Sequence, residues 1–195
     1  MDDTRYGAYD VAVAGGGLAG LAAAVSAARA GARTLLIEKS GWLGGLGFSG
    51  ATGLHSFFNI YAAHPGAQRQ RVVAGLAQEL VDRIQAAGGG LGHIQMERGG
   101  DFVSMLTPVE PEVAKAVAAQ MCREAGVRLL LHTVVDEVRA AAGCIEGLVV
   151  WNKGGRSLIR ARQYVDCTGD GDLAVAAGAP HERYRAGDPG AYAAG

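Results

Sequence analysis

Short apolar runs and one alanine-rich segment alternate over the first forty residues. Residues 9–14 and 33–38 are largely apolar, which is typical of strands buried on both faces of a parallel sheet. Residues 18–30 between them predict a helix that ends at Gly31. The whole unit has about the length of a strand–helix–strand crossover. This pattern predicts an α/β fold built on a parallel sheet.

A second helical pattern covers residues 70–87. Its apolar positions recur at helical spacing, at Val73, Leu76, Leu80 and Ile84. Three glycines at positions 88–90 end this helix. Residues 91–109 have poor periodicity and could supply one or two short strands of a second layer.

From Glu110 onward the chain returns to helix and strand patterns. Pro111 suits the first turn of a helix, which we expect to end at Gly126. Residues 127–131 predict a third parallel strand, and residues 163–167 predict another one that leads into a short helix. Three strands between them, joined by turns, predict an antiparallel β-meander: residues 134–139, 145–151 and 157–160.

Composition and charge narrow the class of protein. The 195 residues are 49% hydrophobic with a formal net charge of −1, so a sizeable core is possible and nucleic-acid binding has no basic surface to support it. Arg29, Gly31 and Arg33 argue against a membrane span in the apolar N-terminal region. Neither the cysteines nor the histidines have the spacing of metal ligands, so we predict no metal site. The three cysteines are far apart and odd in number, which fits a reducing compartment and predicts a cytoplasmic location.

The turn after the first strand carries the main candidate chemistry. Gly15, Gly17 and Gly20 have the G-x-G-x-x-G spacing, and Glu38 ends the next apolar run. The first glycine allows a tight turn, the second lets a pyrophosphate approach the backbone, and the third lets helix and strand pack closely. The acidic side chain can accept hydrogen bonds from a ribose. This arrangement indicates a dinucleotide-binding site.

A second glycine-rich stretch follows, over residues 39–53. Long loops of this kind are often functional, although a plain surface loop is the alternative. A surface loop would leave Leu43, Leu46 and Phe48 in water, which favours a loop that lies against a ligand. Trp42 in this loop either covers a ligand or belongs to the core.

Four features occur in a distinctive order: the glycine loop with Glu38, the segment 38–45 ending in Leu43-Gly44-Gly45, the inserted meander, and Thr168-Gly169-Asp170. Together they resemble the glutathione-reductase-like flavoproteins with two dinucleotide-binding domains. In outline the chain is also similar to fumarate reductase and succinate dehydrogenase flavoproteins, among FAD-dependent oxidoreductases. Residues 165–174 are especially close to that group, with Cys167 where alanine is commoner.

The resemblance implies a Rossmann-like FAD-binding domain with an inserted meander and the start of a second, substrate region. It implies FAD as cofactor and flavin-mediated hydride or electron transfer to or from an unidentified small molecule. It also implies a set of cofactor-binding residues, from the glycine loop at the pyrophosphate to the turn that approaches it from the other side: Gly15, Gly17, Leu18, Ala19, Gly20, Glu38, Lys39, Leu43, Gly44, Gly45, Val135, Thr168, Gly169 and Asp170.

The expected organisation places the FAD-binding domain in two parts around an insertion. Residues 1–60 and 111–180 form the two parts, residues 61–110 begin the substrate region, and residues 181–195 lead into a missing C-terminal portion. Such flavoproteins return to the FAD domain with a last strand, for which we find no candidate. We therefore expect a truncated chain, or one that self-associates or uses a partner chain through an incomplete sheet edge.

Several alternatives remain open from the residues alone. An NAD-dependent dehydrogenase would share the glycine motif, and a non-catalytic FAD-binding fragment or subunit would need a partner chain. Catalytic residues are not assigned; His55 could donate to a substrate or tune the flavin, or it could be an ordinary surface residue. Asp170 and Asp172 fit cofactor binding and an N-cap, and Cys167 fits packing better than redox chemistry.

Overall fold

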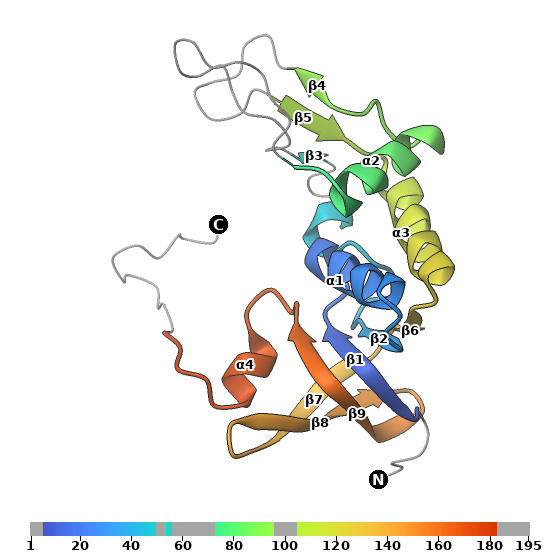
Figure 1. Cartoon of the computed structure of the whole chain (residues 1–195). Coiled ribbons are helices and arrows are strands. Elements are labelled where there is room, and N and C mark those ends of the chain that lie inside the picture. The colour runs from blue at the N-terminus through green and yellow to red at the C-terminus, as the bar shows by residue number, and fades with distance from the viewer. Residues whose placement is uncertain (1–5, 50–53, 56–72, 96–104, 183–195) are drawn as a thin grey trace.

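The computed structural model describes residues 6–49, 54–55, 73–95 and 105–182. A six-stranded sheet carries helices on both faces, and a small second sheet lies at the opposite end of the molecule from the hairpin β7–β8 (Figure 1). The helices are α1 (Leu18–Arg29), α2 (Leu76–Ala86), α3 (Pro111–Ala125), α4 (Asp172–Ala176) and the 3₁₀ turn η1 (Gly45–Phe48). The strands are β1 (Ala8–Ala14), β2 (Thr34–Ile37), β3 (Leu54–His55), β4 (Ile94–Gln95), β5 (Met105–Pro108), β6 (Arg128–Leu130), β7 (Val134–Ala141), β8 (Cys144–Asn152) and β9 (Gly155–Asp166).

The large sheet has the strand order β6–β2–β1–β9–β8–β7. Strands β6, β2, β1 and the second half of β9 run parallel, and Val13 of β1 lies between Leu36 of β2 and Val165 of β9. Strands β7, β8 and the first half of β9 form the antiparallel meander. The predicted α/β class, its parallel sheet and its inserted meander are confirmed.

Strand β9 differs from the prediction. Two separate strands were expected over residues 157–160 and 163–167, but one continuous strand pairs with β8 as far as Ile159 and then with β1 from Arg160 onward. The polar residues around Arg162 interrupt the apolar pattern because their side chains are exposed, while the backbone pairing with β1 continues. The prediction of a break at this point is therefore wrong.

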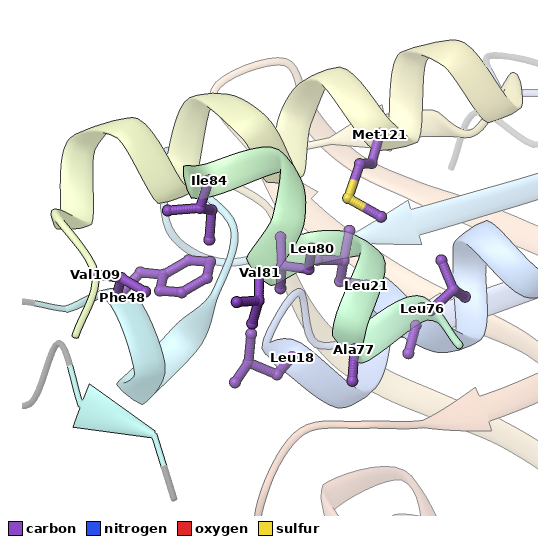
Figure 2. A pocket seen from close by; sticks show the side chains of 11 residues that line it. Leu18, Leu21, Phe48, Leu76, Ala77, Leu80, Val81, Ile84, Val109 and Met121 are labelled. Carbon is purple, nitrogen blue, oxygen red and sulfur yellow. The ribbon is translucent and has the colours of Figure 1, made fainter. Parts of the chain in front are cut away.

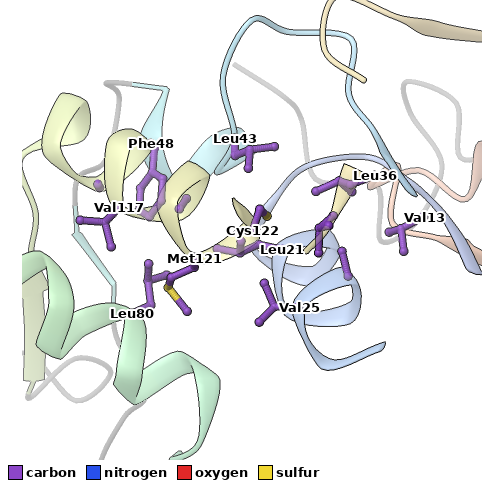
Figure 3. Packing of buried hydrophobic residues seen from close by; sticks show 14 of the residues in the cluster. Val13, Leu21, Val25, Leu36, Leu43, Phe48, Leu80, Val117, Met121 and Cys122 are labelled. Carbon is purple, nitrogen blue, oxygen red and sulfur yellow. The ribbon is translucent and has the colours of Figure 1, made fainter. Parts of the chain in front are cut away.

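Alternate residues of the central strands serve two different cores. Val13 and Leu36 pack against α1 and α3, in a cluster that includes Leu21 and Met121 (Figure 3). On the other face, side chains from β1 and β2 pack against the meander and α4: Ala12, Ala14, Leu35 and Ile37 with Leu148, Val150, Ile159 and Leu173. The central strands are thus buried on both faces, as their continuous apolar runs predict.

Helix α2 and the small sheet β3–β5–β4 form a second layer beyond α1 and α3. The short strands expected in residues 91–109 are present as β4 and β5, although residues 96–104 lie outside the described residues. The apolar face of α2 does not fill the space above α1 and α3 completely. A cavity of about 100 Å³ remains between them, lined by apolar side chains that include Leu80, Ile84 and Met121 (Figure 2).

Candidate functional site

The glycine loop between β1 and α1 is packed against the end of β9. Gly15 has φ +94°, and a Cβ there would collide with the carbonyl oxygen of Cys167. A Cβ at Gly20 would overlap the carbonyl oxygen of Gly15. Glycine is required at both positions by the protein's own packing, as the motif predicts.

Gly17 is different, because no contact among the described residues explains its lack of a side chain. It is the N-cap residue of α1, with φ −67° and ψ −174°, a conformation open to any residue. A Cβ built on it would meet no atom of residues 6–49, 54–55, 73–95 or 105–182 within 4 Å and would project into open space. Gly17 lines a cleft at the C-terminal ends of the parallel strands, so the space beside it is available to a ligand.

The second glycine-rich stretch packs directly on this loop. The Gly44 amide donates to the Gly16 carbonyl at 2.8 Å, and a Cβ on Gly45 would lie 3.1 Å from the Cα of Gly17. Leu43, one residue earlier, points into the core and is 1% exposed. The described part of this stretch, residues 39–49, is therefore a fixed wall of the cleft with Leu43 as its anchor, and not a plain surface loop.

Glu38 connects the glycine loop to the second glycine-rich stretch through hydrogen bonds. Its carboxylate accepts hydrogen bonds from the Gly16 amide at Oε2 and from the Ser40 amide at Oε1, both at 2.6 Å. The residue is 7% exposed, yet it still lines the cleft. A carboxylate has about four lone-pair sites, so Glu38 keeps capacity to accept from a ligand hydroxyl.

The third wall is the turn after β9, which Asp166 organises. Its Oδ1 accepts hydrogen bonds from the Thr168 hydroxyl at 2.7 Å and the Thr168 amide at 3.1 Å, and its Oδ2 accepts from the Ala174 amide at 3.0 Å. Partial burial works to raise the pKa of Asp166, but the hydrogen bonds from Ala174 and Thr168 lower it below its ordinary value. Asp166 is thus an ionised brace beneath the turn.

This arrangement corrects one expectation. Asp170 and Asp172 were expected to cap the helix that follows, but the N-cap of α4 is Gly171, and no side chain of that residue can cap it. The Asp172 amide instead donates to the Thr168 hydroxyl at 2.9 Å. Asp166 and Thr168 therefore satisfy the first turn of α4, a role that the sequence analysis missed.

The walls enclose a cleft with a volume of about 590 Å³. It brings together most of the predicted cofactor-binding residues: Gly15, Gly17, Leu18, Glu38, Lys39, Gly44, Gly45, Val135, Thr168 and Gly169. The others do not line it: Ala19, Gly20, Leu43 and Asp170. His55 belongs to β3, opposite Thr107 of β5, and its catalytic role stays a prediction.

The cleft also contains residues that the sequence analysis did not assign to it. Trp42, Leu46 and Val134 line it although they are large apolar residues exposed by 44%, 86% and 46%. Trp42 is therefore a cleft residue and not a core residue. Asp136 lies at a register shift of β7, where a bulge re-aims the chain, and pairs with Arg156 at 2.6 Å.

Cys167 lines the cleft as well. Partial burial, together with the neighbouring Asp166 carboxylate, raises the pKa of its thiol. Cys167 therefore stays a neutral thiol near pH 7, which fits packing and not nucleophilic chemistry.

The sequence matches one family of known proteins over most of its length. The profile of the family described as FAD dependent oxidoreductase matches residues 10–191. The chain belongs to this family. FAD is accordingly its cofactor. No curated protein matches the sequence significantly.

Solved structures share this fold at low sequence identity. A geranylgeranyl bacteriochlorophyll reductase-like protein from Thermoplasma acidophilum is 22% identical with a TM-score of 0.55, and the match covers 88% of this chain and 42% of that one. A flavocytochrome c3 fumarate reductase is 18% identical with a TM-score of 0.56, and the match covers 84% of this chain and 34% of that one. A ketosteroid dehydrogenase from Rhodococcus jostii is 18% identical with a TM-score of 0.55, and the match covers 84% of this chain and 47% of that one. The chain spans less than half the length of each.

Two further observations concern the described residues alone. None of their helices has the length and apolarity that crossing a bilayer requires. No three of their histidine, cysteine, aspartate or glutamate side chains gather as a metal ion would need.

Proposed function

We propose that the cleft binds FAD with its pyrophosphate beside Gly17 and the first turn of α1. The single observation that carries this assignment is the open space at Gly17, a residue whose conformation any amino acid could adopt. The unpaired amides and partial positive charge at a helix N-terminus attract a pyrophosphate. The cleft volume of about 590 Å³ is within the range of cofactor sites.

The other walls fit the remaining parts of the cofactor. Glu38 would accept hydrogen bonds from the adenosine ribose, and Lys39 and Val135 would flank the adenine. Gly44 and Gly45 would lie along the ribityl chain, and Thr168 and Gly169 would approach from the opposite wall. Leu43 and Gly20 would support these groups from behind, since they do not line the cleft. Asp170 is exposed and also lies outside the lining, and its contact with the cofactor stays a prediction. Ala19 stays a predicted contact.

The proposed activity of the whole protein is oxidation or reduction of a small organic molecule in the cytoplasm. Bound FAD supplies the hydride or electron-pair chemistry, and this chain binds and orients it. The chain spans less than half the length of the similar structures described above, so substrate recognition would depend on further polypeptide or a partner chain.

The test is a comparison of cofactor retention in two variants of the chain. Gly17→Val fills the space that the pyrophosphate needs, so we expect a folded but colourless protein with at least hundredfold weaker FAD binding. Ser26→Val is the matched control, because it places the same side chain on the exposed side of α1. Circular dichroism verifies folding, and flavin absorbance gives the dissociation constant. Wild-type retention of FAD by Gly17→Val would refute the assignment.

A further inference from the structure

We propose that Trp42 is the aromatic wall of the adenosine subsite and that Lys115 of α3 holds its indole ring in position. The inference rests on the proposed FAD site and adds a residue to it. Trp42 follows Glu38, Lys39 and Ser40 along the chain, and all four residues line the cleft. It therefore stands on the stretch of wall assigned to the adenosine half of the cofactor.

A cation fixes the indole from the side of α3. The Lys115 ammonium lies 4.9 Å from the centroid of the Trp42 ring, within the distance of a cation–π interaction. Glu112 pairs with this ammonium at 2.7 Å, and the Lys115 side chain is only 18% exposed. Because α3 is anchored in the core by residues such as Ala118, Lys115 provides a rigid support for the ring.

The exposure of Trp42 supports a ligand on its free surface. The residue is 44% exposed despite its contact with Lys115, and Val134, another exposed apolar residue, also lines the cleft. Stacking of a base on an aromatic side chain is a strong and geometrically simple contact. An adenine ring is the part of FAD that matches this position beside Glu38.

Fluorescence provides a direct test, because the sequence contains two tryptophans. The other one, Trp151, does not line the cleft, although it is the cross-strand partner of Val134 and must therefore be removed. Trp151→Phe removes the exposed tryptophan of β8 and leaves Trp42 as the single reporter. The cofactor-free Trp151→Phe chain is titrated with ADP, which contains the adenosine half of FAD and does not absorb tryptophan emission. We expect saturable quenching of Trp42, whereas an unchanged emission on ADP binding would overturn the inference.

Affinity measurements test the contribution of each partner. We expect Trp42→Leu to weaken ADP binding about tenfold and Trp42→Phe to retain most of the affinity. Lys115→Met should weaken binding about threefold and alter the emission of Trp42 in the unliganded protein. Lys153→Met, an exposed site in the β8–β9 turn, is the control and should change neither.

The outcomes separate this inference from the proposed function. Unchanged ADP and FAD affinity in Trp42→Leu, with Gly17→Val still unable to bind FAD, would overturn the role of Trp42 and leave the FAD site standing. Failure of the wild-type chain to bind FAD or ADP would overturn both.

Discussion

The cofactor-binding half of the molecule and its second layer differ in how closely their side chains pack. Around β1, β2 and the glycine loop, the contacts are close and apolar, and Val13, Leu36 and Leu43 are at most 1% exposed. Helix α2 also contributes Leu80 and Ile84 to this apolar cluster, but it leaves an incompletely filled cavity above α1 and α3 and adds ion pairs at its rim. The difference indicates a precise cofactor site joined to a more loosely fitted second layer.

The ion pairs of the second layer form one continuous network. Arg29 of α1 contacts both carboxylate oxygens of Glu79 on α2 at 2.7 Å. Arg83 on α2 pairs with Glu79 at 2.9 Å and with Glu124 of α3 at 2.6 Å. Such partly exposed pairs are weak individually but orient α2 on the two helices beneath it.

The largest effect is expected where the packing is closest. Gly15→Ala would place a methyl group against the Cys167 carbonyl and would strain a backbone with φ +94°, so we expect a loss of about 3 kcal/mol or failure to fold. Gly31→Ala is the control, with φ +90° and open space, and should cost about 1 kcal/mol. Urea unfolding measures both, and equal losses would contradict the role of close packing.

Asp166→Asn tests the brace beneath the third wall. It removes the charge and one acceptor of the network to Thr168 and Ala174, so we expect a loss of about 2 kcal/mol in the free energy of unfolding. FAD affinity should also fall because the Thr168–Gly169 turn loses its support. Asp170→Asn, an exposed neighbour, is the control for stability. A variant as stable as the control would show that the brace is dispensable.

Glu79→Gln tests the ionic attachment of α2. The hydrogen-bonded Arg29 guanidinium, assisted by Arg83, lowers the pKa of Glu79 from 4.5 to about 2. A lowered pKa in the folded state means that the pairing stabilises the protein above pH 4.5 and is lost as the pH falls towards 2. We expect the variant to lose about 1 kcal/mol at neutral pH and nothing at the acid end. The measurement is the free energy of unfolding of Glu79→Gln and of the wild-type chain across this pH range, with Glu146→Gln as the control. A difference between Glu79→Gln and the wild type that does not change with pH would contradict the role of the ion pairs.

The smallest effect should be a gain in stability. Ala77→Leu places additional apolar atoms in the cavity beneath α2, which should stabilise the chain by about 0.5 kcal/mol. Ala86→Leu adds the same atoms at an exposed position of the same helix and is the control. Thermal unfolding compares the two variants, and a loss of stability in Ala77→Leu would show that the cavity beneath α2 has no room for the added atoms.

The sequence predicted the elements whose signals are local. Helix α3 begins at Pro111 and ends before Gly126, which has φ +78°, because both residues mark helix ends by their own conformational limits. The glycine loop and Glu38 were likewise recognised from spacing alone. The continuity of β9 was missed because its exposed polar side chains interrupt the apolar pattern without interrupting the backbone pairing.

The parts of the site that could not be predicted depend on contacts between distant segments. Arg29 and Glu79 are fifty positions apart, and Lys115 and Trp42 are 73 positions apart, so no periodicity links the members of either pair. The function of Asp166 depends on the direction of its side chain beneath a turn, which the sequence does not specify. Leu43 was assigned to the cofactor by resemblance, whereas its size and apolarity place its side chain in the core.

Strand β9 belongs to both halves of the large sheet and fixes their register relative to each other. Its first residues set the register of the meander, and its last residues deliver the Thr168–Gly169 turn to the cleft. A residue inserted between Ile159 and Arg160 would shift the pairing of β9 with β1 by one residue relative to its pairing with β8. Every β9 side chain beyond the insertion would then point to the opposite face of the sheet. Changes in length can therefore be absorbed at the β7–β8 and β8–β9 turns, but not within β9 itself.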